Sequence, residues 1–113
     1  MENNYVYDAV NNLATSIKES KEYLDYKQAK AELLATPDLK EKVDEFEKIR
    51  YEEQLLAMQG EKQSDEKMKK LQELYDILSK NPSIKEYFDK EVRFNILIAD
   101  VNRIIGEAIK DVL

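Results

Sequence analysis

The sequence contains no cysteine, histidine or tryptophan, and only 2 glycines and 2 prolines among its 113 residues. Without cysteine and histidine, the chain cannot form a disulfide, a Cys–His or Ser–His catalytic pair, or a zinc, haem or iron–sulfur site with thiolate or imidazole ligands. A ferritin-type di-iron site is excluded as well, because its Glu-x-x-His motif needs histidine. We therefore predict no catalytic residue, no metal ligand and no cofactor. A catalytic pair of carboxylates stays open, but no pattern picks one out.

The scarcity of glycine and proline bears on the fold. Sheets need many turns, and turns favour these two residues, so a sandwich, a barrel or a doubly wound sheet is disfavoured. We predict an all-α protein of about five helices, arranged as an elongated antiparallel bundle with a long C-terminal helix. A chain of this length corresponds to a single domain, predicted over residues 1–113.

The charge balance bears on partners and location. The 18 basic and 24 acidic residues give a net charge of −6, and no basic run is longer than Lys69-Lys70. Phosphate would be repelled on average, which predicts no direct contact with nucleic acid. The start Met1–Asn4 lacks the features of a signal peptide, and the longest apolar stretch, Phe94–Ala99, is far short of the ~20 residues of a membrane span. We expect a soluble, cytoplasmic protein that does not contact the membrane.

Apolar periodicity and helix punctuation predict five helices. Their ranges are residues 5–18, 21–35, 37–59, 65–80 and 82–111. The predicted punctuation consists of Ser20, Thr36 and Ser64 as N-caps, Pro37 and Pro82 as first helical residues, and Gly60 as a stop.

Arg50 and Glu53 lie three residues apart on the third predicted helix and can form an ion pair. This pair has two interpretations, a charged contact for a partner or a solvated pair where the apolar stripe leaves the core. The second is favoured, because exposed pairs are common and contribute only ~0–1 kcal/mol.

The last predicted helix is the most informative segment. About 30 residues extend ~45 Å, whereas a compact chain of this length has a radius of gyration near ~13 Å. The apolar side chains of Leu97–Leu113 cover roughly 220° of the helix, and a surface helix needs little more than ~100°. This helix is therefore either central in its own fold or packed between its own chain and another.

One face of this helix provides the candidate interaction residues, with Asn95 and Asn102 seven residues apart. Buried asparagines at a heptad spacing fix the register of a partner helix, and Gly106 would let two backbones approach closely. In the alternative interpretation, both asparagines bond locally or contact water, and Gly106 marks a fraying turn. The predicted interaction residues are Phe94, Asn95, Ile98, Val101, Asn102, Ile105, Gly106 and Ile109.

The succession of these residues resembles the YlbF/YmcA family of small helical bacterial regulators, over nearly the whole chain. The N-terminal part of the resemblance is Asp8-Ala9-Val10, Leu13-Ala14, Ile17-Lys18-Glu19-Ser20, Glu22-Tyr23 and Tyr26. The remainder is Ala29, Leu33, Pro37-Asp38, Glu45-Phe46, Gly60, Leu74-Tyr75, Leu78, Asn81-Pro82, Ile84, Tyr87, Ile98, Val101, Ile104-Ile105 and Ile109.

The resemblance implies an all-α fold and a non-enzymatic adaptor role. Members of the family assemble with relatives and a third protein, and influence RNA processing by endoribonuclease Y, competence, sporulation and biofilm formation. Some members contribute cysteines to an iron–sulfur cluster, and this chain departs from them because it has no cysteine.

Two classes of function follow from the sequence. The first is a regulatory adaptor that acts through helix-mediated protein contacts, as a homo-oligomer with a dimer preferred, or as a hetero-oligomer with related proteins. The second is a chaperone-like or structural helical protein that binds the helices of other proteins.

Overall fold

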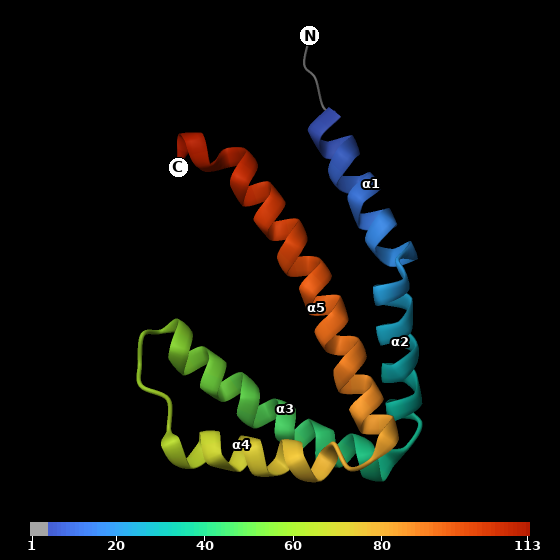
Figure 1. Cartoon of the computed structure of the whole chain (residues 1–113), viewed down its shortest axis with the longest axis vertical. Coiled ribbons are helices and arrows are strands. Elements are labelled where there is room, and N and C mark those ends of the chain that lie inside the picture. Colours follow the sequence, from blue (N-terminus) through green and yellow to red (C-terminus); the bar gives the residue numbers. More distant parts are fainter. Residues whose placement is uncertain (1–4) are drawn as a thin grey trace. The chain divides into compact units, whose positions relative to one another are not determined.

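The computed structural model describes residues 5–113, which are almost entirely helical and contain no strand. Along the chain the helices are α1 (Tyr5–Glu19), α2 (Lys21–Leu34), α3 (Pro37–Met58), α4 (Asp65–Leu78) and α5 (Pro82–Ile109), followed by a 3₁₀ turn over Lys110–Val112 (Figure 1). The predictions of an all-α fold, of five helices and of a long C-terminal helix are confirmed. The segment Met1–Asn4, whose composition predicts no leader peptide, lies outside the described residues.

Two helices begin at the serines that the sequence predicts as caps. The hydroxyl oxygen of Ser20 accepts a hydrogen bond from the backbone N–H of Tyr23 at 3.1 Å, and that of Ser64 accepts one from Lys67 at 3.3 Å. Each bond satisfies one of the N–H groups that the first turn of a helix leaves without a partner. These local patterns therefore determine where α2 and α4 start.

Other boundaries have the predicted position but a different chemistry. Thr36 precedes α3, yet its hydroxyl donates to the backbone carbonyl of Glu32 at 3.4 Å and does not cap α3. The side-chain oxygen of Asn81, which we did not predict as a cap, accepts from the backbone N–H of Ser83 at 2.9 Å and so caps α5. Gly60 follows α3 with φ +74°, the left-handed conformation that glycine adopts at little cost.

The chain divides into two compact units. Unit 1 comprises the described residues up to Gln28 together with Asp89–Leu113, and unit 2 comprises Ala29–Phe88. The single domain over residues 1–113 therefore stays a prediction.

Unit 2 holds the apolar core. Helices α3 and α4 form an antiparallel hairpin in it (Figure 1). Phe88 lies 5.3 Å from the rings of both Phe46 and Tyr75. Aromatic pairs at such separations stabilise a core beyond the area that they bury. The buried apolar residues are Leu33, Val43, Phe46, Leu78, Ile84, Tyr87 and Phe88, and all of them belong to unit 2.

Unit 1 has a different character. Within its described residues no apolar side chain is fully buried, and the one buried residue is the acidic Glu91. Helix α1 has no buried residue along its whole length, although its apolar residues recur at helical spacing. Unit 1 therefore lacks the apolar core that unit 2 possesses.

Candidate protein interface

All eight predicted interaction residues lie on α5 within unit 1. At about 100° per residue their side chains fall on one side of the helix. Phe94, Ile98 and Val101 are half-buried, whereas Asn95, Asn102, Ile105, Gly106 and Ile109 are exposed. The face is thus half-covered near Phe94 and open to solvent toward the C-terminal end of the helix.

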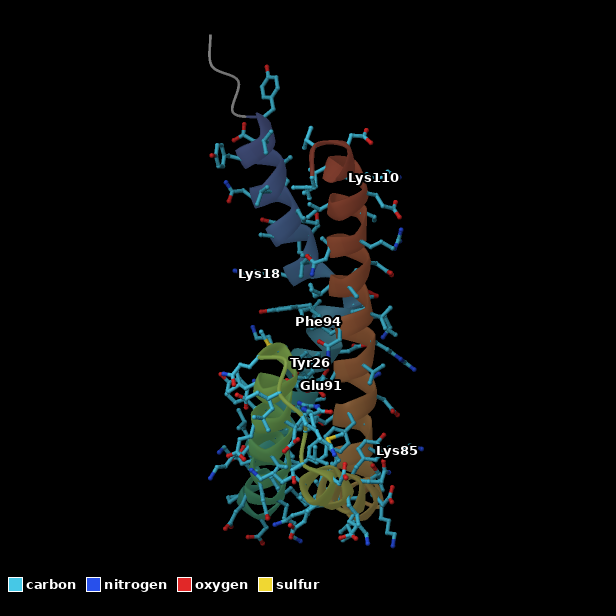
Figure 2. The ribbon with its side chains drawn as sticks, turned by 90° about the vertical axis from the view of Figure 1, so that its left-hand side faces the viewer. Lys18, Tyr26, Lys85, Glu91, Phe94 and Lys110 are labelled. Carbon is cyan, nitrogen blue, oxygen red and sulfur yellow. The ribbon has the colours of Figure 1, made fainter. Side chains whose placement is uncertain are left out.

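Phe94 is engaged inside the chain itself. Its ring lies 6.0 Å from Tyr23 and 5.5 Å from Tyr26, both on α2. The hydroxyl of Tyr26 donates to a carboxylate oxygen of Glu91 at 3.1 Å, one helical turn from Phe94 (Figure 2). The aromatic contact and the hydrogen bond hold α2 against α5 at this end of unit 1.

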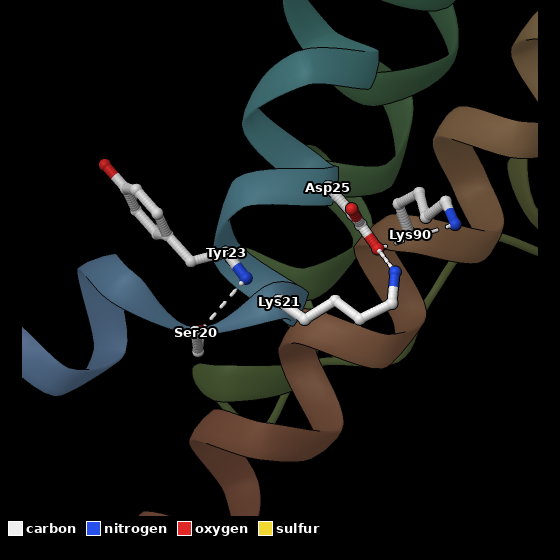
Figure 3. A network of polar contacts seen from close by, with 5 residues as sticks. All are labelled: Ser20, Lys21, Tyr23, Asp25 and Lys90. Atoms are coloured by element: carbon white, nitrogen blue, oxygen red, sulfur yellow. Dashed lines mark hydrogen bonds and ion pairs between the residues drawn. The ribbon is translucent and has the colours of Figure 1, made fainter.

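An ion-pair cluster reinforces the same contact (Figure 3). Asp25 Oδ2 lies 2.6 Å from Lys21 Nζ on its own helix and 3.7 Å from Lys90 Nζ on α5. The hydrogen bond from Lys21 lowers the pKa of the Asp25 carboxyl against the opposing effect of desolvation, and the positive charge of Lys90 adds to the lowering. The cluster stabilises unit 1 as long as Asp25 is ionised.

Among the described residues, the C-terminal half of α5 has no comparable aromatic or ionic partner on α2. Ile104 and Ile105 are 59% and 48% exposed, and a Cβ added at Gly106 would meet no atom within 4 Å. The charged side chains of this segment pair among themselves, with Arg103 3.9 Å from Asp100 and 3.5 Å from Glu107. The result is an exposed apolar face beside a strip on which one arginine lies close to two carboxylates.

Helix α1 presents a second exposed apolar face, which we did not predict as an interface. Val6 and Val10 are 69% and 55% exposed, while Leu13 and Ile17 are half-buried. The periodicity alone indicated a core-facing helix. The charge pattern could have indicated this exposed apolar face. Tyr5–Ile17 carries a single charged residue, Asp8, whereas 37% of the residues in the whole chain are charged.

The preferred interpretation of Arg50 and Glu53 as a solvated pair is wrong. Glu53 is only 1% exposed, and its Oε2 accepts a hydrogen bond from the backbone N–H of Ser64 at 3.0 Å. Arg50 instead lies 3.9 Å from Glu47 and over the ring of Phe46. The spacing of Arg50 and Glu53 allows an ion pair on an isolated helix. In the folded chain the loop after α3 folds back, and the backbone N–H of Ser64 binds the Glu53 carboxylate.

Over residues 5–113, no three acidic side chains come together in a way that would hold a metal ion. Over the same residues, no helix is both long and apolar enough to cross a membrane.

The chain is similar to known proteins over almost its whole length. A family model described as "Control of competence regulator ComK, YlbF/YmcA" matches residues 6–110. The relatives are named UPF0342 proteins. One from Desulfitobacterium hafniense is 38% identical over 96% of this chain and 87% of its own, and one from Caldicellulosiruptor bescii is 36% identical over 93% and 88%. A third, from Symbiobacterium thermophilum, is 33% identical over 92% of this chain and 93% of its own.

Proposed function

The chain belongs to the YlbF/YmcA family, and from this premise we propose that it is a non-enzymatic, cytoplasmic adaptor that regulates through protein–protein contacts. The family description, control of the competence regulator ComK, gives the regulatory class. The processes that the sequence resemblance implies, RNA processing, competence, sporulation and biofilm formation, are the candidates for what is regulated.

The observation that carries the proposal is the exposed apolar face of α5 in a unit without buried apolar residues. Ile105 and Ile109 are 48% and 44% exposed, and the exposed Asn102 lies on the same side of the helix. Contiguous exposed apolar surface on a small protein marks a contact site for another macromolecule. An apolar helix face is recognised by packing against apolar helices of a protein partner.

The predicted site residues have two tasks in this proposal. Ile98, Val101, Ile105 and Ile109 supply apolar area to the partner. The exposed Asn95 and Asn102 supply side-chain amides, which set the register of the partner helix when both of their polar groups are paired. Such a site needs no metal, cofactor or bound substrate in order to act.

A matched pair of substitutions on α5 tests the proposal. Ile105→Asp places a charge on the proposed face, and Ile96→Asp makes the same change nine residues away, on the opposite side of the helix at about 100° per residue. Ile96 is also exposed, so both variants are expected to fold. Tagged wild-type protein and both variants are used to capture partners from the native host.

The proposal expects that Ile105→Asp loses the captured regulatory proteins while Ile96→Asp retains them. Equal capture by both variants would place the contact elsewhere. A partner set unchanged by either substitution, together with unchanged competence in a strain carrying Ile105→Asp, would contradict an adaptor role for this face.

A groove in unit 2 favours the second candidate function, a chaperone-like or structural protein that holds the helices of others. It is about 300 Å³ in volume and is lined by Phe46, Met68, Leu71, Gln72 and Tyr75 of α3 and α4. If this groove is the binding site, the native protein increases the fluorescence of an apolar dye, and Met68→Lys removes the increase while Ile105→Asp leaves it.

A further inference from the structure

Unit 1 contains a small charged pocket between α2 and α5 that the proposed function does not use. The pocket is about 70 Å³ in volume and is lined by Lys21, Glu22, Asp25, Lys90 and Arg93. All five residues belong to unit 1. Three of the side chains are cationic and two are anionic, so the pocket has a net charge of +1 in a chain whose net charge is −6.

Two of the three cations share one carboxylate of the chain. Lys21 Nζ donates a hydrogen bond to Asp25 Oδ2 at 2.6 Å, whereas Lys90 Nζ lies 3.7 Å from the same oxygen (Figure 3). At 3.7 Å the opposite charges still attract each other, but the separation is too long for a hydrogen bond. The Lys90 side chain is only 20% exposed. Its ammonium group therefore has donors that no acceptor in the described part of the chain satisfies.

The third cation, Arg93, has no carboxylate partner in the described part of the chain. Its guanidinium lines the pocket without a hydrogen bond or an ion pair to any other described side chain. By contrast Arg103, ten residues further along α5, lies 3.5 Å from Glu107. A guanidinium presents its donors in a planar fork that matches the two oxygens of a carboxylate. Arg93 therefore offers this fork to a group from outside the chain.

We propose that the charged pocket binds one carboxylate group of another molecule, with Arg93 and Lys90 as the hydrogen-bond donors. The inference goes beyond the proposed function and does not depend on it, because no residue of the pocket belongs to the proposed α5 face. A small organic acid and an acidic side chain of another protein both carry such a group.

Charge and size favour a carboxylate over a phosphate. A phosphate monoester has a charge of about −1.5 to −2 at neutral pH, which exceeds the net charge of the pocket and would be repelled by Glu22 and Asp25. A carboxylate has a single negative charge and matches it. Because one water molecule takes up ~30 Å³ in the liquid, about 70 Å³ holds a terminal group of a few atoms but not a nucleotide.

Glu22 gives the proposal a consequence of definite sign. This carboxylate lines the pocket, is half-buried and forms no ion pair with a described residue. It competes with an external carboxylate for the guanidinium of Arg93 and repels the external charge. Glu22→Gln should therefore tighten carboxylate binding, whereas a substitution that merely loosened α2 would weaken it.

Nitrogen-15 NMR of the full chain tests the site. The probe is sodium acetate, sodium chloride at the same ionic strength is the control, and the side-chain Nε–H signals of Arg93 and Arg103 are followed together. The proposal expects a saturable shift of the Arg93 signal with acetate and none with chloride. Arg103 is the control within the molecule, because carboxylates of its own helix already neutralise it.

Matched variants assign the binding to the pocket, with the backbone N–H signal of Lys90 as the readout. Arg93→Gln should weaken acetate binding about threefold or more, the effect of losing one charge pair at a partly exposed site. Arg103→Gln removes the same charge from another part of α5 and should leave the affinity unchanged. Glu22→Gln should raise the affinity. Far-UV circular dichroism checks that all three variants are helical.

A second probe distinguishes the two sources of the carboxylate. Glutamate blocked by an acetyl group and an amide carries its single charge on the side chain, and the blocked glutamine is its neutral control. Binding of blocked glutamate at least as tight as that of acetate, with none for blocked glutamine, assigns the pocket to an acidic side chain of another protein. Binding of acetate alone assigns it to a small organic acid.

Three results would overturn the inference. They are the absence of a saturable Arg93 shift in acetate, an equal affinity in Arg93→Gln and the wild type, and tighter binding of inorganic phosphate than of acetate. Each of these leaves the proposed function untouched, because that function is judged by the partners that Ile105→Asp captures. Conversely, Ile105→Asp should bind acetate as the wild type does.

Discussion

The carboxylate of Glu53 on α3 accepts the backbone N–H of Ser64 at 3.0 Å, and so ties the start of α4 to the preceding helix. The hydroxyl of Ser64 in turn caps α4, and the side chain of Gln63 donates to the backbone carbonyl of Glu53 at 3.2 Å. The loop between α3 and α4 is therefore held through one buried acidic residue. The other carboxylate oxygen of Glu53 is buried and has no hydrogen-bond partner in the described part of the chain.

Removing this carboxylate is expected to destabilise the protein. Glu53→Ala leaves the N–H of Ser64 without its acceptor and should lower the free energy of unfolding by about 1–3 kcal/mol. Glu53→Gln keeps an acceptor oxygen and should cost less. The control Glu52→Ala removes an exposed ion pair with Lys67, worth ~0–1 kcal/mol. Urea unfolding measures all three, and equal losses for Glu53→Ala and Glu52→Ala would contradict the assignment.

The hydroxyl of Tyr26 is expected to stabilise unit 1 through its bond to Glu91. Tyr26→Phe keeps the ring contact with Phe94 but removes a donor to a buried carboxylate, and should cost about 1 kcal/mol. Tyr51→Phe is the control, because Tyr51 is 61% exposed. Thermal unfolding followed by circular dichroism should show a lower Tm for Tyr26→Phe only.

Asp25 is expected to make stability depend on acid pH. The hydrogen bond from Lys21 lowers the pKa of Asp25 in the folded chain, so the unfolded chain takes up the proton first as the pH falls. The stabilisation is complete above the unfolded pKa of about 3.9 and is lost as the pH falls through the lower folded pKa.

Carbon-13 NMR titration of the Asp25 carboxyl measures this effect. In Lys21→Met the pKa of Asp25 should move back toward its ordinary value. In Lys27→Met it should stay low, because Lys27 lies two residues from Asp25 and so on another side of α2. An Asp25 pKa that is the same in Lys21→Met and in the wild type would refute the assignment.

The two glycines are expected to respond in opposite directions to replacement by alanine. Gly60 has φ +74°, a conformation that costs an alanine roughly 1 kcal/mol, and no neighbour obstructs a Cβ there. Gly106 lies within α5, where alanine is favoured over glycine by up to ~1 kcal/mol. Gly60→Ala should lower Tm and Gly106→Ala should raise it in dilute protein. If two backbones approach at Gly106, the same variant should also associate more weakly in sedimentation experiments.

The sequence predicted most of the fold because its signals are local. Ser20 and Ser64 cap helices through hydrogen bonds to residues three positions away, and Gly60 ends a helix through its own backbone conformation. Such signals do not depend on the rest of the molecule. Thr36 precedes α3 as predicted but forms no capping bond with its side chain, because its hydroxyl donates to a competing acceptor, the carbonyl of Glu32.

The candidate site was predicted only in part, because burial depends on residues distant in sequence. Glu53 is buried by a loop that begins six positions later, which helical spacing cannot show. The apolar face of α5 was predicted from the width of the apolar arc around this helix. The exposed face of α1 was not predicted, because a helix that packs on its own core and a helix that binds a partner can carry the same narrow apolar stripe.

The boundary between the two units falls inside α2, after Gln28, and inside α5, before Asp89. No loop crosses it, and the segments that link α2 to α3, α3 to α4 and α4 to α5 all belong to unit 2. A protease that cuts at exposed loops would therefore never release unit 1 as a fragment. Exchange of one unit between related genes would require two junctions within continuous helices.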